Sequence, residues 1–176
     1  MRPRLDLKHL DCGGGLSLSA LTRGDLPAIA EMLRDPDVAA WYGEDHDAAL
    51  AEIAGHIDDA IVSPFLVSLE GVPHGYLQAY HANSEPFWQS FGVPEQTYGL
   101  DMFLGAARGL GLGRRMCRAM IDYLFSLPDV MRVQIDPDHE NPRAIAAYRG
   151  AGFREVGRFP GYYPGETMVY MAKDRV

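Results

Sequence analysis

Residues 108–115 read RGLGLGRR, and this glycine-rich turn joins a predicted strand over 98–104 to a predicted helix over 112–125. Small residues there let backbone N–H groups point at an anion, and a helix N-terminus adds partial positive charge. The arginines of the stretch are suited to neutralising phosphates. It lacks the Gly-Lys-Ser/Thr ending of a Walker A loop, and Arg114 stands where the dinucleotide fingerprint needs its third glycine. Spacing alone leaves two interpretations, a phosphate-binding turn or a flexible connection with surface arginines.

The residues after the turn alternate between helical and strand patterns. One helix carries apolar residues at the i, i+3, i+4, i+7 spacing of a buried stripe, namely Cys117, Met120, Ile121 and Leu124. Asn141 and Pro142 are a fitting N-cap and first residue for the next helix, which Gly152 ends. The predicted elements are a helix over 112–125, a strand over 132–136, a helix over 141–148 and strands over 153–158 and 167–173.

The residues before the turn predict a similar mixture. LSLSAL (16–21) alternates like a half-buried strand, and Thr22 is placed to cap a helix with Ile29, Met32 and Leu33 on one face. We expect a loop over 35–47, a helix over 48–62, strands over 64–70 and 75–81, and a long loop over 82–97. Residues 1–15 are expected to be a flexible tail before a single domain over 16–176. The order of elements predicts a mixed α/β (α+β) fold, with helices covering a mixed sheet.

Composition excludes several classes of protein. The chain has 176 residues, 24 acidic and 16 basic, and its net charge of −8 argues against nucleic acid or an anionic membrane as partner. No apolar run suits a membrane span, and the N-terminus lacks the apolar stretch of a signal peptide. Cys12 and Cys117 form no disulfide pattern, so a cytoplasmic location is expected. The histidines show no metal-ligand spacing, so no metal is expected.

Two motifs together resemble the GNAT superfamily of N-acetyltransferases. Arg108, Gly111 and Gly113 match its Arg-x-x-Gly-x-Gly turn, which binds the pyrophosphate of acetyl-CoA. NPRAIAAYRGAGF (141–153) matches its second signature, Asn-x-x-Ala-x-x-x-Tyr-x-x-x-Gly-Phe. The resemblance covers residues 16–173. It implies a central mixed, mostly antiparallel sheet of about six or seven strands flanked by about four helices, with acetyl-CoA as the acetyl donor.

Shorter stretches resemble the aminoglycoside 6'-N-acetyltransferases in particular. They are WYGE (41–44), GYLQAY (75–80), GLD (99–101), DPD (136–138) and VYM (169–171). A sister branch that acylates hydroxylysine-type amines for siderophores has a similar DPxxxNxRA stretch, but typically histidine where this chain has Asp101. Two features depart from the resistance enzymes, a shorter link from Asp101 to the glycine turn and a different loop over 161–166.

The resemblance implies roles for particular residues. Asp101 is expected to bind the amine and act as general base, and Tyr148 to act as general acid toward the departing thiolate. Asn141 is expected to cap its helix and contact pantetheine. The structural alternatives are a strand-end carboxylate for Asp101 and a core side chain for Tyr148. The residues expected to contact acetyl-CoA are Met102, Phe103, Leu104, Arg108, Gly109, Leu110, Gly111, Leu112, Gly113, Arg114, Asn141, Ala144 and Tyr148.

Acidic and aromatic residues are the candidates for binding the acceptor amine. Carboxylates would hold a polycation, and aromatic rings would stack on sugar faces. Each kind of residue has a structural alternative, since Asp136 also suits an Asp-Pro turn and aromatic residues in loops often serve as packing anchors. The arginines of the turn would then face cofactor phosphates, while Asp138 and the acceptor-side acids draw in the amine. The substrate-binding candidates are Trp41, Tyr42, Glu44, Trp88, Asp101 and Asp136.

The leading hypothesis is an N-acetyltransferase that moves the acetyl group of acetyl-CoA to the 6'-amine of an aminoglycoside-like polycation. No nucleophilic triad is indicated, so the amine would attack directly in a ternary complex. One alternative is the same chemistry on a siderophore precursor or another small amine. Another is a non-catalytic acyl-CoA-binding module, which would not need both Asp101 and Tyr148. No motif decides between a monomer and a homodimer.

Overall fold

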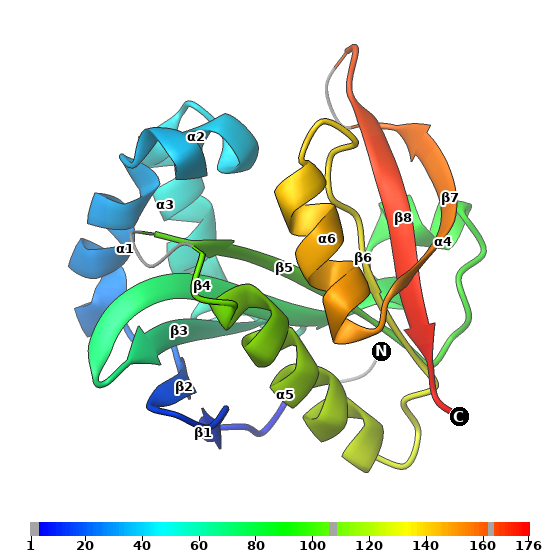
Figure 1. The fold of residues 1–176 in the computed structure, drawn as a ribbon, viewed down its shortest axis with the longest axis horizontal. Coiled ribbons are helices and arrows are strands. Elements are labelled where there is room, and N and C mark those ends of the chain that lie inside the picture. The colour runs from blue at the N-terminus through cyan, green and yellow to red at the C-terminus, as the bar shows by residue number, and fades with distance from the viewer. Residues whose placement is uncertain (1–3, 106–108, 162–163) are drawn as a thin grey trace. The chain divides into compact units, whose positions relative to one another are not determined.

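The computed structural model describes residues 4–105, 109–161 and 164–176, which form the expected mixed α/β fold (Figure 1). The strands follow the order β1-β2-β3-β4-β5-β6-β8-β7. The described residues form eight strands and six α-helices, slightly more than the sequence predicts. The chain divides into a first unit, Met1–Tyr80 with Asp101–Leu112, and a second unit, His81–Leu100 with Gly113–Val176. Strand β5 (Thr97–Leu104) contributes residues to both units.

The first unit contains an antiparallel run of strands. Each of the first three strands pairs antiparallel with the next one along the chain. Glu70 and Gly71 connect β3 to β4 with φ values of 50° and 79°, the positive values that a two-residue hairpin turn requires. The elements are β1 (His9–Asp11), β2 (Leu16–Ala20), the 3-10 helix η1 (Arg23–Asp25), α1 (Leu26–Leu33), α2 (Pro36–Tyr42), α3 (His46–His56), β3 (Ser63–Leu69) and β4 (Val72–His81).

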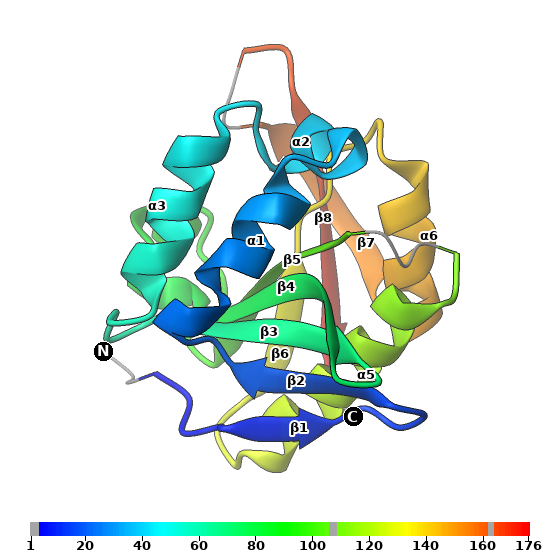
Figure 2. The ribbon, with the colours of Figure 1, turned by 90° about the vertical axis from the view of Figure 1, so that its left-hand side faces the viewer.

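Helices α1 and α3 cover one face of β3 and β4, as Figure 2 shows. Ile29 and Leu33 of α1 are buried as their helical spacing predicts, and Ile53 of α3 joins them. Leu66 and Tyr76 are cross-strand partners on β3 and β4, so both point into this core. Burial of each large apolar side chain contributes about 1.5–3 kcal/mol, so this core stabilises the first unit.

Three expectations for the first unit were wrong in detail. The predicted loop over 35–47 contains α2, because Asp35 caps it by accepting a hydrogen bond of 2.9 Å from the backbone N–H of Asp37 and Pro36 opens it. The predicted helix over 48–62 is α3, which ends early because the Asp59 carboxylate accepts backbone N–H groups of a following turn. The expected tail over 1–15 contains β1, which pairs antiparallel with β2.

The second unit combines parallel and antiparallel pairing. Thr97–Gly99 of β5 runs parallel to Arg132–Gln134 of β6, while β8 pairs antiparallel with both β6 and β7. The predicted stripe of α5 is confirmed, since Cys117, Met120, Ile121 and Leu124 are fully buried. The elements are the 3-10 helix η2 (Ala82–Ser84), α4 (Pro86–Ser90), α5 (Leu112–Ser126), β6 (Arg132–Ile135), α6 (Pro142–Ala151), β7 (Arg154–Pro160) and β8 (Thr167–Asp174).

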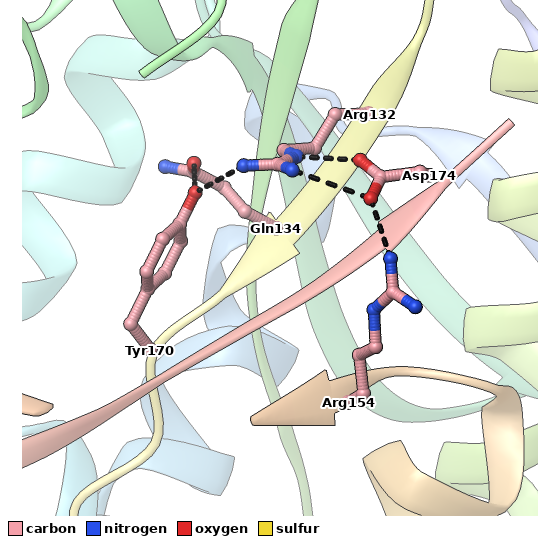
Figure 3. Close-up of polar contacts among 5 residues, drawn as sticks. All are labelled: Arg132, Gln134, Arg154, Tyr170 and Asp174. Carbon is pink, nitrogen blue, oxygen red and sulfur yellow. Dashed lines mark hydrogen bonds and ion pairs between the residues drawn. The ribbon is translucent and has the colours of Figure 1, made fainter. Parts of the chain in front are cut away.

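An ion-pair cluster ties the three C-terminal strands together (Figure 3). The Arg132 guanidinium donates to both carboxylate oxygens of Asp174, at 2.6 and 3.2 Å. Arg154 of β7 donates to the same carboxylate at 2.8 Å. Beside them, the hydroxyl of Tyr170 donates to Oε1 of Gln134 at 3.0 Å. Each strand of this group therefore contributes at least one polar side chain to a shared network.

The predicted loop over 82–97 contains the two short helices η2 and α4. Pro86 opens α4, and apolar rings hold that helix in place. Phe87 and Trp88 pack against Phe159 of β7 at ring-centroid distances of 5.3 and 5.6 Å, and Trp88 also meets Tyr170 of β8 at 5.6 Å. Helical propensity over five residues is too weak to predict α4, so tertiary packing explains its formation.

Candidate active site

Asp101 lies on β5 in the first unit, where the carboxylate is only partly exposed. Its Oδ2 accepts a hydrogen bond of 2.8 Å from Nε2 of Gln78 on β4. The hydroxyl of Tyr76 donates to Oε1 of Gln78 at 2.7 Å, and Nδ1 of His56 lies 3.4 Å from the same hydroxyl. The candidate base thus stands at the end of a hydrogen-bonded chain that begins on α3.

Aromatic rings surround the inner end of this chain. Tyr42, Tyr76 and Phe103 form a cluster with ring-centroid distances of 4.9–6.3 Å, and Tyr76 stacks on Phe103. Burial raises the pKa of both tyrosines, and the negative charges of Asp101 and Glu52 raise each of them further. Both phenols therefore stay protonated at neutral pH and can donate hydrogen bonds.

Strand β5 approaches β4 closely at Gly75. A Cβ atom on this glycine would lie 2.5 Å from the carbonyl oxygen of Phe103, and the N–H of Gly105 donates to the carbonyl of His74 at 2.8 Å. Any other residue at 75 would have to push the strands apart. The glycine that opens the GYLQAY stretch therefore allows β4 and β5, the two strands that carry Gln78 and Asp101, to approach closely.

Two glycines in the described part of the turn adopt positive φ angles. Gly109 and Gly111 have φ values of 80° and 69°, and no atom lies within 4 Å of a Cβ built on either one. Gly109, Leu110 and Gly111 are exposed, and α5 begins directly after them at Leu112. Their position at the start of a 15-residue helix makes these exposed residues the candidate site for a phosphate group. Arg108, the first residue of the motif, lies outside the described residues.

The second motif forms the start and body of α6 in the second unit. The predicted cap is confirmed, since Oδ1 of Asn141 accepts a hydrogen bond of 3.1 Å from the backbone N–H of Ala144. Tyr148 is 8% exposed and meets Phe153 edge-to-face at 6.1 Å. The side chain of Arg114 runs beside Gly150, where an added Cβ would lie 2.7 Å from its Cδ. The motif thus combines a structural cap with a mostly buried tyrosine.

The comparisons with known proteins agree with these motifs. The sequence profile described as "Acetyltransferase (GNAT) domain" matches residues 22–160. The chain belongs to the GNAT acetyltransferase family. The acetyltransferase is 32% identical over 170 residues to aminoglycoside N(6')-acetyltransferase type 1 of Klebsiella pneumoniae, covering 91% of this chain and 83% of that protein. It is also 25% identical over 149 residues to spermidine N(1)-acetyltransferase of Escherichia coli (strain K12), covering 81% of this chain and 74% of that one.

Solved structures show the same similarity. The acetyltransferase matches AAC(6')-Ib in complex with paromomycin and acetyl-CoA at a TM-score of 0.80 and 30% identity, covering 92% of this chain and 94% of that one. A complex of AAC(6')-Ib with coenzyme A and kanamycin gives the same TM-score and identity, with 91% and 95% covered. The protein is thus an acetyl-CoA-dependent N-acetyltransferase rather than the non-catalytic module that the sequence left open.

The predicted acceptor-binding residues of this acetyltransferase fall in both units. Tyr42 lies within the aromatic cluster, next to a half-exposed Trp41 at the end of α2, and Glu44 follows in an exposed loop. In the second unit, Asp136 is buried directly after β6. Trp88 is only 2% exposed within the rings of α4, β7 and β8, a placement that favours its packing alternative.

The residues expected along β5 have different environments. Phe103 is buried in the core of the first unit, while Met102 and Leu104 are partly exposed. No grouping of three or more His, Cys, Asp or Glu side chains within 4–105, 109–161 and 164–176 could hold a metal ion. In the same part of the chain, no helix has the length and apolar character needed to cross a membrane.

Sequence reasoning missed Gln78, Tyr76 and His56 as parts of the site. For Tyr76 and Gln78 the signal is the alternation in GYLQAY, which places both on the same face of β4. That face is the one that meets Phe103 and Asp101, two residues on one face of β5. His56 lies on α3, and no motif in the sequence indicates it. A single sequence does not give the pairing of β4 with β5, so the contact between Gln78 and Asp101 emerges only from the structure.

Proposed function

We propose that this acetyltransferase moves the acetyl group of acetyl-CoA to the 6'-amine of an aminoglycoside-like polycation. The observation that carries the proposal is the Asp101 carboxylate, partly exposed and held by the amide of Gln78. The similarity to an aminoglycoside N(6')-acetyltransferase over 91% of the chain supports the acceptor class. The net charge of −8 suits a polycationic acceptor, because surplus carboxylates attract it.

The proposed roles follow from what amine acetylation requires. A primary ammonium has a pKa of about 10.4 and must lose a proton before its nitrogen can attack a thioester. Asp101 would bind the ammonium and accept that proton, directly or through a water. Tyr148 would supply a proton to the departing thiolate. The exposed amides of Gly109 and Gly111 would bind the pyrophosphate of acetyl-CoA, with Arg114 as a neighbouring positive charge.

Further acidic and aromatic side chains would complete the acceptor site. We assign Asp136 to a second amine of the polycation, since it is a buried carboxylate at the end of β6. Trp41, with 46% of its surface exposed, would stack on a sugar ring, and Glu44 would meet an amine from the adjacent loop. Residues 16–176 would form the single catalytic domain, since the family profile covers 22–160.

The second candidate is acetylation of another small amine. The similarity to a spermidine N(1)-acetyltransferase favours it, because a polyamine is also a flexible polycation. A siderophore precursor with a hydroxylysine-type amine is a further member of this class. The carboxylate of Asp101 suits all of these acceptors, so identifying the acceptor requires an experiment.

Thiol release from acetyl-CoA, measured with a panel of amines, tests the proposal. We expect turnover with kanamycin and tobramycin, slower turnover with spermidine, and none with a kanamycin analogue that carries a hydroxyl in place of the 6'-amine. NMR of the product should place the acetyl group on the 6'-nitrogen. Turnover with spermidine or a siderophore precursor but not with any aminoglycoside would instead establish the second candidate.

A further inference from the structure

The hydrogen bonds from Tyr76 to Asp101 have a defined direction. The Tyr76 hydroxyl donates to Oε1 of Gln78, so the carbonyl side of that amide is occupied. The amide nitrogen of Gln78 is left to face Asp101, where it donates to Oδ2. Nδ1 of His56 lies 3.4 Å from the same Tyr76 oxygen. The donors of Tyr76 and Gln78 therefore both point toward the carboxylate.

The position of Tyr76 fixes this direction. Tyr76 is fully buried, its ring stacks on Phe103 at 5.6 Å and 28°, and Tyr42 meets it edge-on at 82°. Its hydroxyl therefore has one location, beside the amide oxygen of Gln78. The tyrosine keeps its proton, because burial and the nearby carboxylates raise its pKa. A hydroxyl that is always protonated and always in one place selects one of the two orientations of the amide.

The two amide orientations affect Asp101 in opposite ways. An N–H facing the carboxylate stabilises its ionised form and so lowers its pKa. A carbonyl facing the carboxylate would repel it and raise its pKa. The ionisable groups that face Tyr76 or its phenol are Tyr42 on α2, Glu52 and His56 on α3, and Asp101 on β5.

We propose that Tyr76 is a positioning residue that acts through Gln78, holding an amide N–H toward Asp101 so that its carboxylate stays ionised and oriented for the acceptor amine. The proposal rests on the proposed role of Asp101 as general base. It adds that the ability of Asp101 to accept a proton depends on two buried residues of β4 that need not contact either substrate.

The first test is the pH dependence of kcat in Tyr76→Phe, which removes one hydroxyl and keeps the ring. We expect kcat to fall about tenfold, a change typical of a disturbed general base. The acidic limb of the profile should move to higher pH, while the KM for acetyl-CoA stays within about twofold. Gln78→Glu, which places a carboxylate oxygen opposite Asp101, should move the limb further in the same direction.

A double-mutant cycle separates positioning from a general loss of packing. Tyr76 acts through Gln78, so Tyr76→Phe should have little further effect on kcat when Gln78→Leu is already present. Tyr170→Phe is the matched control, because it also removes a tyrosyl hydroxyl that donates to a glutamine, here Gln134 at 3.0 Å (Figure 3). We expect this control to leave kcat and the acidic limb unchanged.

A second measurement needs no acceptor. Titration of the Asp101 carboxyl by 13C NMR, assigned with Asp101→Asn, should give a higher pKa in Tyr76→Phe and Gln78→Glu than in the unmodified protein. An unchanged Asp101 pKa in both variants would overturn the proposal, whatever the acceptor proves to be.

If Asp101→Asn is inactive and Tyr76→Phe keeps the original pH profile of kcat, positioning by Tyr76 is refuted while the proposed function stands. If Asp101→Asn is fully active, the role of the base fails, and the NMR shift alone decides whether Tyr76 controls the carboxylate.

Discussion

Nε2 of Gln78 donates a hydrogen bond of 2.8 Å to Oδ2 of Asp101, which joins the middle of β4 to the middle of β5. The contact connects the candidate base to the core of the first unit, because the same face of β4 carries Tyr76. Asp101, the candidate base, is therefore supported by buried residues rather than by a loop.

The glycine turn should tolerate only residues that accept a positive φ. Gly111→Ala introduces a side chain at a residue whose φ is 69°. The surrounding space is open, but the backbone conformation alone should lower the free energy of unfolding by about 1–2 kcal/mol. We expect lower stability in urea unfolding and weaker acetyl-CoA binding in calorimetry, and a smaller loss for Gly111→Asn. Gly55→Ala is the control, because it lies within α3 and should be neutral or stabilising by about 0.5–1 kcal/mol. Equal behaviour of Gly111→Ala and Gly55→Ala would contradict this account of the turn.

The carboxylate of Asp174 should stabilise the C-terminal strands in a pH-dependent way. Hydrogen bonds from Arg132, then from Arg154, hold its pKa below the ordinary value. A lowered pKa stabilises the fold at pH values above the unfolded pKa of about 3.9, and this stabilisation is lost as pH falls through the folded value. Asp174→Asn should therefore lower the free energy of unfolding by about 1 kcal/mol at pH 7, allowing for partial exposure, and by less near pH 3.

The exposed Lys8–Asp6 pair, at 3.6 Å, provides the control for that measurement. Asp6→Asn should change stability by less than about 0.5 kcal/mol at either pH, because water screens such pairs. A difference between Asp174→Asn and the unmodified protein that grows toward pH 3 would show that the sign of the linkage is wrong.

Trp88 should prove to be a packing residue. Its ring is 2% exposed among Phe87, Phe91, Phe159 and Tyr170. Trp88→Ala should lower the free energy of unfolding by about 3–5 kcal/mol, and Trp88→Phe should lower it by less. In Trp88→Phe the KM for the acceptor should stay unchanged. Trp41→Phe is the comparison, because Trp41 is 46% exposed. This substitution should change the free energy of unfolding by less than about 0.5 kcal/mol relative to the unmodified protein. A raised acceptor KM in Trp88→Phe at unchanged stability would instead assign Trp88 to the acceptor site.

The sequence predicted the regular elements well and the short ones poorly. The stripe of α5 and the Asn141 cap of α6 have strong local patterns, and both are confirmed. Helix α2 was missed although Asp35, Pro36 and Gly43 mark its ends, because its seven residues bury only Val38. Strand β1 has no pattern of its own, since three residues become a strand only by pairing with β2.

The site could be predicted only in part, for a related reason. Asp101 and the glycine turn stand out through motifs, since their spacing along the chain is sufficient to recognise them. Gln78 reaches Asp101 through the alignment of two strands that are separated in sequence by the 82–97 segment. The direction of its amide depends on Tyr76, and hence on ring packing that no local pattern encodes.

The turnover of Asp101→Asn with acetyl-CoA and a kanamycin-type acceptor tests most directly whether Asp101 is the general base. The variant keeps the size of the side chain and removes its ability to accept a proton. We predict that kcat falls at least about a hundredfold, the scale expected for loss of a general base, while calorimetry gives an unchanged Kd for acetyl-CoA. Asp122→Asn, an exposed carboxylate on α5, should retain full activity as the control. Full turnover by Asp101→Asn would contradict the account.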